Sequence, residues 1–419
     1  MNAMPIGNNF QHASYARSDP GERVSYREFQ PGAPPDSLAW QDAMARLGAH
    51  LSQAGVRAVL FLHGTFLSSD LFGVQRLDEA GGLKRGYSRG IPGMEALLAL
   101  MREGSNGLPA LPGGKKPPLA DDDATTALLD EHAGDAANFT RAYVELFRNA
   151  VNRNVSRPIV CTRLLWSCEH HHLGRAQAAI RLLTRLRSLR AELKLGAGDR
   201  ILVQAHGQAG LVLALVSNLL APDQSSGREA LLQTLRDHLP AGDLEQLESL
   251  LPTGHVLNGA ALDVVTFGTP VRYGWDPSTL DKLLHIVNHR PMRGDGKRWL
   301  AKMELPQITM EMPIAWGGDY VQQLAVAGSD AIPTSPAGQA ANKALWELLE
   351  PHDGFERWLE CARKSVRCAN DGICLLVDYK DSTGATNARD HVFGHAAYTR
   401  TNAMLFNTTE IVKGLYAPG

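Results

Sequence analysis

Short apolar runs alternate with helical segments along most of the chain, and this alternation constrains the fold more than any other feature. Stretches with the apolar spacing of buried helices lie at residues 176–193 and 211–220. The runs before and between them have the length of buried strands, and apolar strands separated by helices predict a mostly parallel sheet with helices on both faces. These runs are VRAVLFL, PIVCTRLLW, DRILVQ and LDVVTF, at residues 56–62, 158–166, 199–204 and 262–267.

The remaining segments indicate one domain with additions. We expect residues 1–50, which are polar and interrupted by Gly and Pro, to be an N-terminal extension of a single domain at residues 51–419. Residues 85–157 contain LPALPGGKKPPLADDD, which is incompatible with regular structure, and residues 222–256 are helical and rich in charge. We interpret both segments as cap insertions over the core. Further strand-like runs lie at residues 283–288 and 372–379.

Composition and charge argue against several classes of partner. A formal net charge of −2 gives no basic surface for DNA or RNA, so we expect no nucleic-acid partner. The N-terminus lacks an apolar signal region, and no run of about 18 apolar residues occurs. We therefore expect no integral membrane segment and a cytoplasmic location, with export by a route without a signal peptide left open. The five cysteines form no C-x-x-C pair and are expected to be reduced.

Three short motifs lie at the ends of predicted strands or near the end of the chain. In parallel sheets, functional residues collect at the carboxyl ends of the strands. The motifs are HGTF at residues 63–66, AHGQAG at residues 205–210 and GH at residues 394–395. With them the chain resembles the α/β-hydrolase superfamily, and more narrowly its lipases and esterases, over roughly residues 56–400. The resemblance implies an α/β-hydrolase fold with a helical cap or lid.

Gly207 stands where this resemblance places the nucleophile. The elbow of the superfamily has the pattern G-x-S-x-G, a strained turn from strand to helix that exposes the serine hydroxyl. Ala205 and Ala209 are small enough to keep the close packing of the motif's glycines, but Gly207 has no side chain that can attack a carbonyl. The resemblance therefore implies a carboxylic ester hydrolase with a catalytic triad and an acyl-enzyme mechanism, present in a form that lacks its nucleophile.

The resemblance also implies what the site binds. The cap insertions indicate a covered, partly apolar pocket, so we expect a small-molecule or lipid-like ester as substrate. Ester hydrolysis by a serine triad uses neither a cofactor nor a metal ion, and we expect none. The sequence gives no indication of the oligomeric state.

His63 and Gly64 resemble the oxyanion loop of the superfamily. In that reading the backbone N–H of Thr65 cooperates with the N–H of Gln208, the residue after the nucleophile position, while His206 lies beside the substrate. Backbone donors do not depend on the missing side chain. The alternative is that the His-Gly pair merely ends a strand.

The acid of the triad is expected after a late strand. Asp330, in AGSDAIP, follows residues 320–328 and fits this position, although it would equally suit a turn that caps the next helix. Residues 283–288 are a second candidate for the acid-bearing strand. Asp319, Asp295 and Asp378 therefore stay open as alternatives.

The base is expected in the loop after the last strand. His395, in FGHAAYT, is the better candidate, and His391 is its rival. Two histidines within one predicted loop favour a functional role over a structural one.

A run of histidines follows the predicted strand at residues 158–166. His170, His171 and His172 are adjacent, and adjacent side chains rarely converge on one metal ion without a turn, so we expect pocket lining or polar packing instead. Cys168 is a conceivable replacement nucleophile, but no local motif supports it.

Three explanations of Gly207 follow. The chain is an inactivated variant of a hydrolase, a natural pseudoenzyme that binds a ligand or partner, or an enzyme with different chemistry. Glycine relieves backbone strain at an elbow once attack is no longer needed, which fits the second explanation. The intact histidine and aspartate candidates favour the first, because drift would erode all members of a triad.

Overall fold

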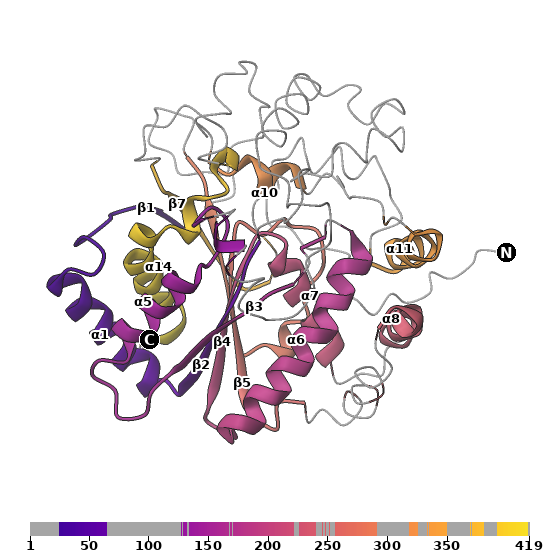
Figure 1. Cartoon of the computed structure of the whole chain (residues 1–419), viewed down its shortest axis with the longest axis horizontal. Helices are drawn as coiled ribbons and strands as arrows, with labels where there is room; N and C mark the ends of the chain where they lie inside the picture. The colour runs from indigo at the N-terminus through magenta and orange to yellow at the C-terminus, as the bar shows by residue number, and fades with distance from the viewer. Residues whose placement is uncertain are drawn as a thin grey trace, which may run out of the picture.

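A parallel sheet forms the centre of the molecule (Figure 1). The computed structural model describes residues 25–64, 127, 129–131, 134–166, 168–169, 171–221, 226–239, 245, 248, 251, 256–290, 318–325, 333, 335–349, 369, 371–380 and 392–417. Within these residues seven strands pair in the order β1-β7-β6-β5-β4-β2-β3, and every pair is parallel. The strands are β1 (Ser25–Glu28), β2 (Val56–Leu62), β3 (Val160–Leu164), β4 (Arg200–His206), β5 (Ala261–Phe267), β6 (Lys282–Asn288) and β7 (Ile373–Asp378).

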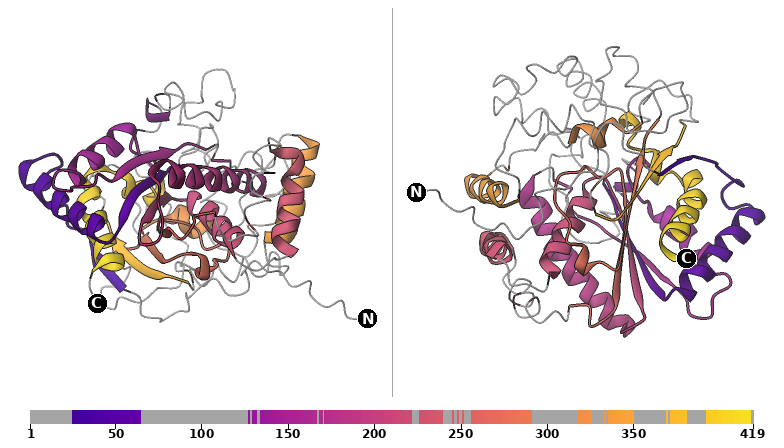
Figure 2. Two further views of the ribbon diagram at one scale, coloured as in Figure 1. Left: turned by 90° about the horizontal axis from the view of Figure 1, so that it is seen from below. Right: turned by 180° about the vertical axis from the view of Figure 1, so that it is seen from behind.

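Helices cover both faces of the sheet, as the alternation predicts (Figures 1 and 2). One face packs against α1 (Leu38–Gln53), α5 (Arg141–Val151) and α14 (Met404–Ile411), which continues as a π-helix, Val412–Tyr416. The other face packs against α6 (His172–Leu193) and α7 (Ala209–Leu220), and α8 (Ser226–Leu235) and α11 (Pro336–Leu349) lie together outside α6. A short helix, α10 (Tyr320–Ala325), and 3-10 turns at Arg236–His238, Pro277–Thr279, Val392–Gly394, Ala397–Thr399 and Thr401–Ala403 complete the described elements.

The central strands are largely apolar because their alternate residues enter two different cores. Leu60 of β2 and Val203 of β4 belong to the core under α6 and α7. Phe61 and Leu202, their neighbours in sequence, belong to the core under α1, α5 and α14. Each buried residue of this size contributes about 1.5–3 kcal/mol to folding. This two-sided burial fixes the register of the central strands and with it the positions of the turns at their carboxyl ends.

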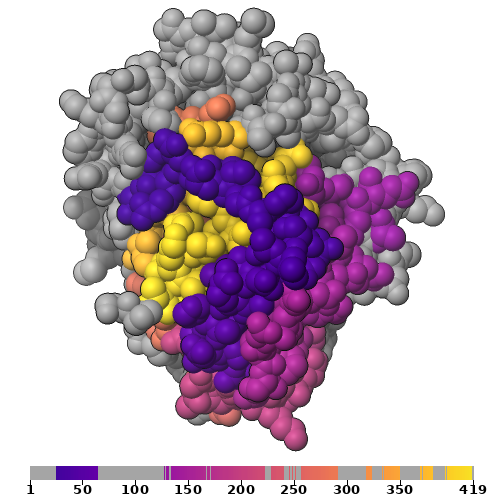
Figure 3. All heavy atoms as spheres, turned by 90° about the vertical axis from the view of Figure 1, so that its left-hand side faces the viewer, coloured from indigo at the N-terminus to yellow at the C-terminus, as the bar shows by residue number. Residues whose placement is uncertain are grey.

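The predicted N-terminal extension takes part in this architecture from residue 25 onwards. β1 pairs with β7 at the edge of the sheet, and α1 packs against α5, α14 and the C-terminal π-helix. Figure 3 shows this N-terminal segment lying against the C-terminal residues 392–417 on one face of the molecule. The beginning and the end of the described chain therefore support each other.

The predicted cap insertions are described only in part. In the 85–157 segment, α5 forms as expected, but it packs on the sheet, where Phe147 and Tyr143 contact the ring of Phe61 edge-on. Residues 85–126 of that segment lie outside the described residues. In the 222–256 segment, α8 forms and packs against α11 and α6. No helix in the described part of the chain is long and apolar enough to cross a membrane.

Candidate functional site

The turn between β4 and α7 has the sharp geometry expected of an elbow. Gly207 has a φ of 55°, in the left-handed region, where other residues are strained by about 1–3 kcal/mol. Its N–H donates to the carbonyl of Phe267 at 2.8 Å, and its own carbonyl accepts a hydrogen bond from Oγ1 of Thr269 at 2.8 Å. A Cβ on Gly210 would lie 2.0 Å from Oγ1 of Thr269, so the turn also needs glycine there.

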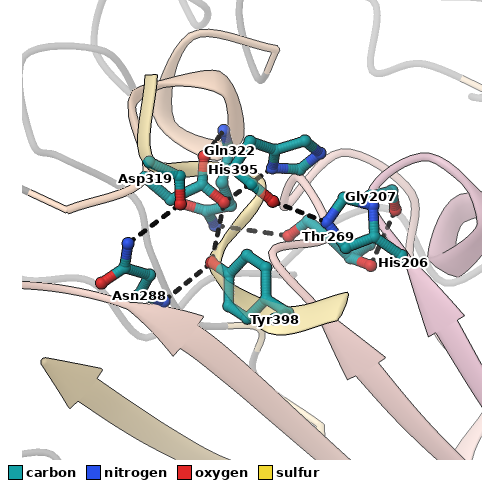
Figure 4. Close-up of polar contacts among 9 residues, drawn as sticks. His206, Gly207, Thr269, Asn288, Asp319, Gln322, His395 and Tyr398 are labelled. Carbon is teal, nitrogen blue, oxygen red and sulfur yellow. Dashed lines mark hydrogen bonds and ion pairs between the residues drawn. The ribbon is translucent and has the colours of Figure 1, made fainter. Parts of the chain in front are cut away.

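The space above Gly207 is faced by a histidine (Figure 4). A Cβ placed on Gly207 would lie 2.6 Å from Nε2 of His395 and 3.2 Å from its Cε1. A side chain at residue 207 would therefore meet the imidazole directly. A contact of 2.6 Å is too close for two heavy atoms that are not hydrogen-bonded, so the ring would have to draw back to admit it.

The other nitrogen of this imidazole contacts a buried carboxylate. Nδ1 of His395 lies 2.7 Å from Oδ2 of Asp319, whose side chain is fully buried. The backbone N–H of Gln322 donates to Oδ1 of Asp319 at 2.8 Å, and the N–H of Asp319 donates to the carbonyl of Asn288 at 2.9 Å. The carboxylate is thus fixed between the end of β6 and the start of α10, and it holds the imidazole in one orientation and one tautomer.

Tyr398 supplies a further hydrogen bond to the same carboxylate. Its hydroxyl donates to Oδ2 of Asp319 at 2.7 Å and accepts the N–H of Asn288 at 2.7 Å. Burial, with the nearby charge of Asp319, raises the pKa of Tyr398 well above its ordinary value, so the hydroxyl keeps its proton. The side chain of Asn288 also donates to the carbonyl of Gly394 at 2.9 Å, which holds the backbone just before His395.

His206 supports His395 from the strand side. Its Nε2 lies 2.8 Å from the carbonyl oxygen of His395, and because a carbonyl only accepts, Nε2 carries the proton. Burial and the neighbouring His395 lower the pKa of His206 well below its ordinary value, so the ring stays neutral. A Cβ on Gly64 would lie 2.4 Å from Nδ1 of His206, so only glycine lets the loop after β2 approach this closely.

The structure brings several predicted site residues together. Gly207, Gln208, His206, His395 and Gly64 meet around the turn after β4. His63 is buried beside them, where its Nε2 accepts the N–H of Trp166 at 3.2 Å.

Asp319 and Asp378 are the two candidate aspartates that the structure describes, and of these Asp319 contacts His395. Asp378 instead accepts the N–H of Lys380 at 2.9 Å and pairs with Arg290 at 3.3 Å. Thr65, Asp295, Asp330 and His391 lie outside the described residues. The segment before Asp330 forms a helix, α10, directly after Asp319.

The histidine run has local structural contacts. His171 precedes α6 and caps it by accepting the N–H of Gly174 at 2.9 Å, while Nδ1 of His172 lies 2.6 Å from the hydroxyl of Tyr273. Burial raises the pKa of Cys168, so its thiol stays protonated. Ser167 and His170 lie outside the described residues. Within the described part of the chain, no group of three or more His, Cys, Asp or Glu side chains is arranged to hold a metal ion.

No family model, no curated protein and no solved structure matches the chain. The fold that the structure defines is an α/β fold with a parallel seven-stranded sheet in its described residues. Function has to be argued from the residues at the carboxyl ends of β4, β6 and β7.

Proposed function

We propose that this chain is a carboxylic ester hydrolase of the α/β-hydrolase type, similar to lipases and esterases, in a form whose nucleophilic serine is replaced by Gly207. One observation carries the proposal. The missing side chain of Gly207 would lie 2.6 Å from Nε2 of His395, whose Nδ1 lies 2.7 Å from the buried carboxylate of Asp319. Nucleophile, base and acid positions are thus all in contact, as a triad requires.

The chain order and the topology support the same proposal. In α/β-hydrolases the triad follows the order nucleophile, acid, base along the chain, and here the order is Gly207, Asp319, His395. Strand order reverses between β2 and β4, since β3 lies outside β2 while β5, β6 and β7 continue beyond β4. Ligands of open α/β sheets bind at such a switch point, and the turns after β2 and β4 meet there through Gly64 and His206.

Each residue has a role if a serine hydroxyl stands at residue 207. His395 takes the hydroxyl proton as the oxygen attacks the ester carbonyl, and Asp319 orients and stabilises the imidazolium. Gln208 immediately precedes α7, where N–H groups lack intrahelical acceptors, and its backbone N–H can donate to the developing oxyanion. The alcohol leaves with the proton from His395, and water then hydrolyses the acyl-enzyme by the same route.

Without that hydroxyl the covalent steps cannot occur. Removal of the nucleophile from a serine triad costs on the order of 10⁶ in kcat, or about 8 kcal/mol of transition-state stabilisation. The chain with Gly207 is therefore proposed to bind an ester without acylation. The retained contact between Nδ1 of His395 and Asp319, and the hydrogen bonds that hold this carboxylate, support an inactivated variant.

A second candidate is a natural pseudoenzyme that binds a ligand or partner. The observation in its favour is the closeness of His395 to Gly207, because the imidazole fills the space that a serine side chain needs. Glycine also relieves the strain of the left-handed backbone at this turn. A protein adapted to glycine at this position would resist restoration of the serine.

Restoration of the hydroxyl tests the proposal, with Gly207→Ala as the matched control. Both substitutions add the same Cβ, the same backbone strain and the same contact with His395, and they differ only in the oxygen. We expect Gly207→Ser to hydrolyse nitrophenyl esters of increasing acyl length with saturation kinetics. The parent chain and Gly207→Ala should stay at the background rate. A folded Gly207→Ser variant that is as inert as Gly207→Ala would overturn the hydrolase proposal and favour the binding function.

A further inference from the structure

A buried arginine lies beside the proposed elbow and has no place in the triad chemistry. Arg175 is only 1% exposed and belongs to the first turn of α6. Burial of a cation is costly, and the N-terminus of a helix disfavours positive charge. Nε of Arg175 donates to the side-chain oxygen of Gln208 at 2.8 Å. This buried guanidinium therefore contacts the residue directly after Gly207, although its burial is costly.

Two further side chains extend this contact. Nη1 of Arg175 donates to the hydroxyl of Tyr273 at 2.9 Å, and that hydroxyl lies 2.6 Å from Nδ1 of His172. The guanidinium carbon lies 5.7 Å from the centre of the Tyr273 ring. His172, Arg175, Tyr273 and Gln208 are all buried. The group, here called the arginine clamp, joins the start of α6, the loop after β5 and the start of α7.

The peptide between Gly207 and Gln208 at the start of α7 is held by the backbone, because the carbonyl of Gly207 accepts the N–H of Gly210 at 3.1 Å. Gln208 precedes the helix, its side chain makes no capping hydrogen bond to the backbone, and the first turn contains no acidic residue. The carbonyl of Gly207 is held by Thr269. The side chain of Gln208 is held in addition by Nε of Arg175, so this residue is fixed through both its backbone and its side chain.

We propose that Arg175 is a positioning residue for the ester hydrolysis, which acts through Gln208 to keep its backbone N–H directed at the acyl oxygen. This inference rests on the proposed function, because it assigns the Gln208 N–H to the oxyanion. Misplacement of a catalytic donor by about 1 Å can cost on the order of 10²-fold in rate. Loss of the clamp should therefore lower kcat and leave the Michaelis constant nearly unchanged.

A double-mutant cycle in the Gly207→Ser background tests the route through Gln208. Arg175→Met and Gln208→Met should each lower kcat by about 10- to 100-fold, with a change in KM of no more than about threefold. The double variant should be no slower than the slower single variant, because both substitutions remove one shared contact. Independent multiplication of the two losses, or an unchanged kcat in folded Arg175→Met, would overturn the proposal.

Arg185→Met is the matched control for the arginine. Arg185 lies on the same helix, and its Nη1 forms an ion pair with Glu192 at 3.0 Å near the surface. This substitution removes the same groups without touching Gln208, so kcat should stay within about twofold. If Arg175→Met does not fold, Tyr273→Phe keeps the ring and removes only the hydroxyl that holds the guanidinium. A fall in kcat of about threefold to tenfold is expected there, and an unchanged kcat would count against the clamp.

Amide hydrogen exchange separates this inference from the proposed function. In the parent chain with Gly207, Arg175→Met should raise the exchange rate of the amides at residues 205–215 by at least about tenfold, and Arg185→Met should not. If Gly207→Ser is inert but this exchange result holds, the hydrolase proposal fails and the clamp stands as a device that fixes the elbow. Unchanged exchange in Arg175→Met overturns the clamp itself.

Discussion

The two ends of the central sheet carry buried polar networks of different kinds. At the amino end, Nη1 of Arg200 donates to Asp263 at 2.8 Å and 3.1 Å and to Asp281 at 2.5 Å, and Tyr416 donates to Asp263 at 2.7 Å. Opposite charges meet there and tie the C-terminal π-helix to β5. The charged groups of this network pair with one another.

At the carboxyl end the network includes His395, whose imidazole faces Gly207. Within the described part of the chain, Asp319 accepts hydrogen bonds from His395, Tyr398 and the N–H of Gln322. Nε2 of His395 makes no hydrogen bond to another residue in the described part of the chain and faces Gly207. The charged groups of the amino-end network pair with one another, whereas the carboxyl-end network directs Nε2 of His395 at Gly207, as the proposed hydrolase function requires.

The largest effect is expected from the acid at the carboxyl end. In the Gly207→Ser variant, Asp319→Asn should lower kcat by about 10⁴-fold, because the imidazole loses its tautomer and its charge partner. The melting temperature should change little by comparison.

Asp330→Asn is the matched comparison, since Asp330 was the acid first predicted from the sequence. Its kcat should stay within about threefold, as expected for a residue outside the triad. Steady-state kinetics of the two variants decides between the aspartates. A larger loss in Asp330→Asn would contradict the contact seen between Asp319 and His395.

The next largest effect is expected at the amino end, and it should appear in stability. Asp263→Ala removes a fully buried carboxylate that pairs with Arg200, whose side chain is 19% exposed, and loss of a buried hydrogen-bonding partner typically costs about 1–3 kcal/mol of unfolding free energy. Asp281→Ala removes the half-exposed partner of the same arginine and should cost about 0–1 kcal/mol.

Urea unfolding measures both values. In the Gly207→Ser background neither substitution should change kcat of the folded fraction, because the network lies at the opposite end of the sheet from His395. A tenfold fall in kcat in either variant would contradict the claim that the amino-end network affects stability alone.

In the Gly207→Ser variant, Tyr398→Phe should moderately lower both the stability of the protein and kcat. It removes the hydroxyl that joins Asp319 to the N–H of Asn288. We expect a loss of about 1–2 kcal/mol in unfolding free energy and a fall of about tenfold in kcat. A loss of stability without a fall in kcat would show that Tyr398 has a structural role only.

The smallest effect is the pH dependence contributed by His206. Its pKa in the folded protein is lowered well below the value of about 6.5 that it has when unfolded. The unfolded chain therefore binds a proton at a pH where the folded chain does not. Stability is fully present above about pH 6.5 and falls as pH drops towards the folded pKa, by up to about 1.4 kcal/mol per pH unit.

The variant His206→Gln isolates this contribution from that of the other histidines. Glutamine keeps a donor for the carbonyl of His395 but does not titrate. The difference in unfolding free energy between parent and variant should therefore shrink between about pH 6.5 and pH 5. A difference that is independent of pH would show that His206 is not held neutral by its burial.

The sequence predicts the central part of the fold because burial on both sides leaves a clear pattern. The runs at residues 56–62, 199–204, 262–267 and 283–288 are short and mostly apolar, and each lies in a strand of the sheet. The turn at residues 205–210 and the position of His395 after the last strand follow from the same pattern. Edge elements were harder, because β1 has only four residues and gains its partner, β7, from the far end of the chain.

The residues around the histidine were less predictable because their contacts are made in three dimensions. The strand β6 ends at Asn288, and Asp319 follows 31 residues later. No short motif therefore joins Asp319 to that strand. Tyr398 lies in a 3-10 turn three residues after His395 and Arg175 lies in α6, and no sequence pattern predicts their contacts with Asp319 and Gln208. Polar residues that are buried at the carboxyl end of a sheet can be identified only when the three-dimensional structure shows their burial.

The most direct measurement is the intact mass of Gly207→Ser after treatment with a phosphonate ester probe, beside Gly207→Ala and the parent chain. The account predicts one covalent adduct per chain in Gly207→Ser, located by peptide mapping at residue 207, and none in the other two proteins. A folded Gly207→Ser protein that gains no adduct, or an adduct of equal yield in Gly207→Ala, would contradict the assignment of Gly207 as the vacant nucleophile position.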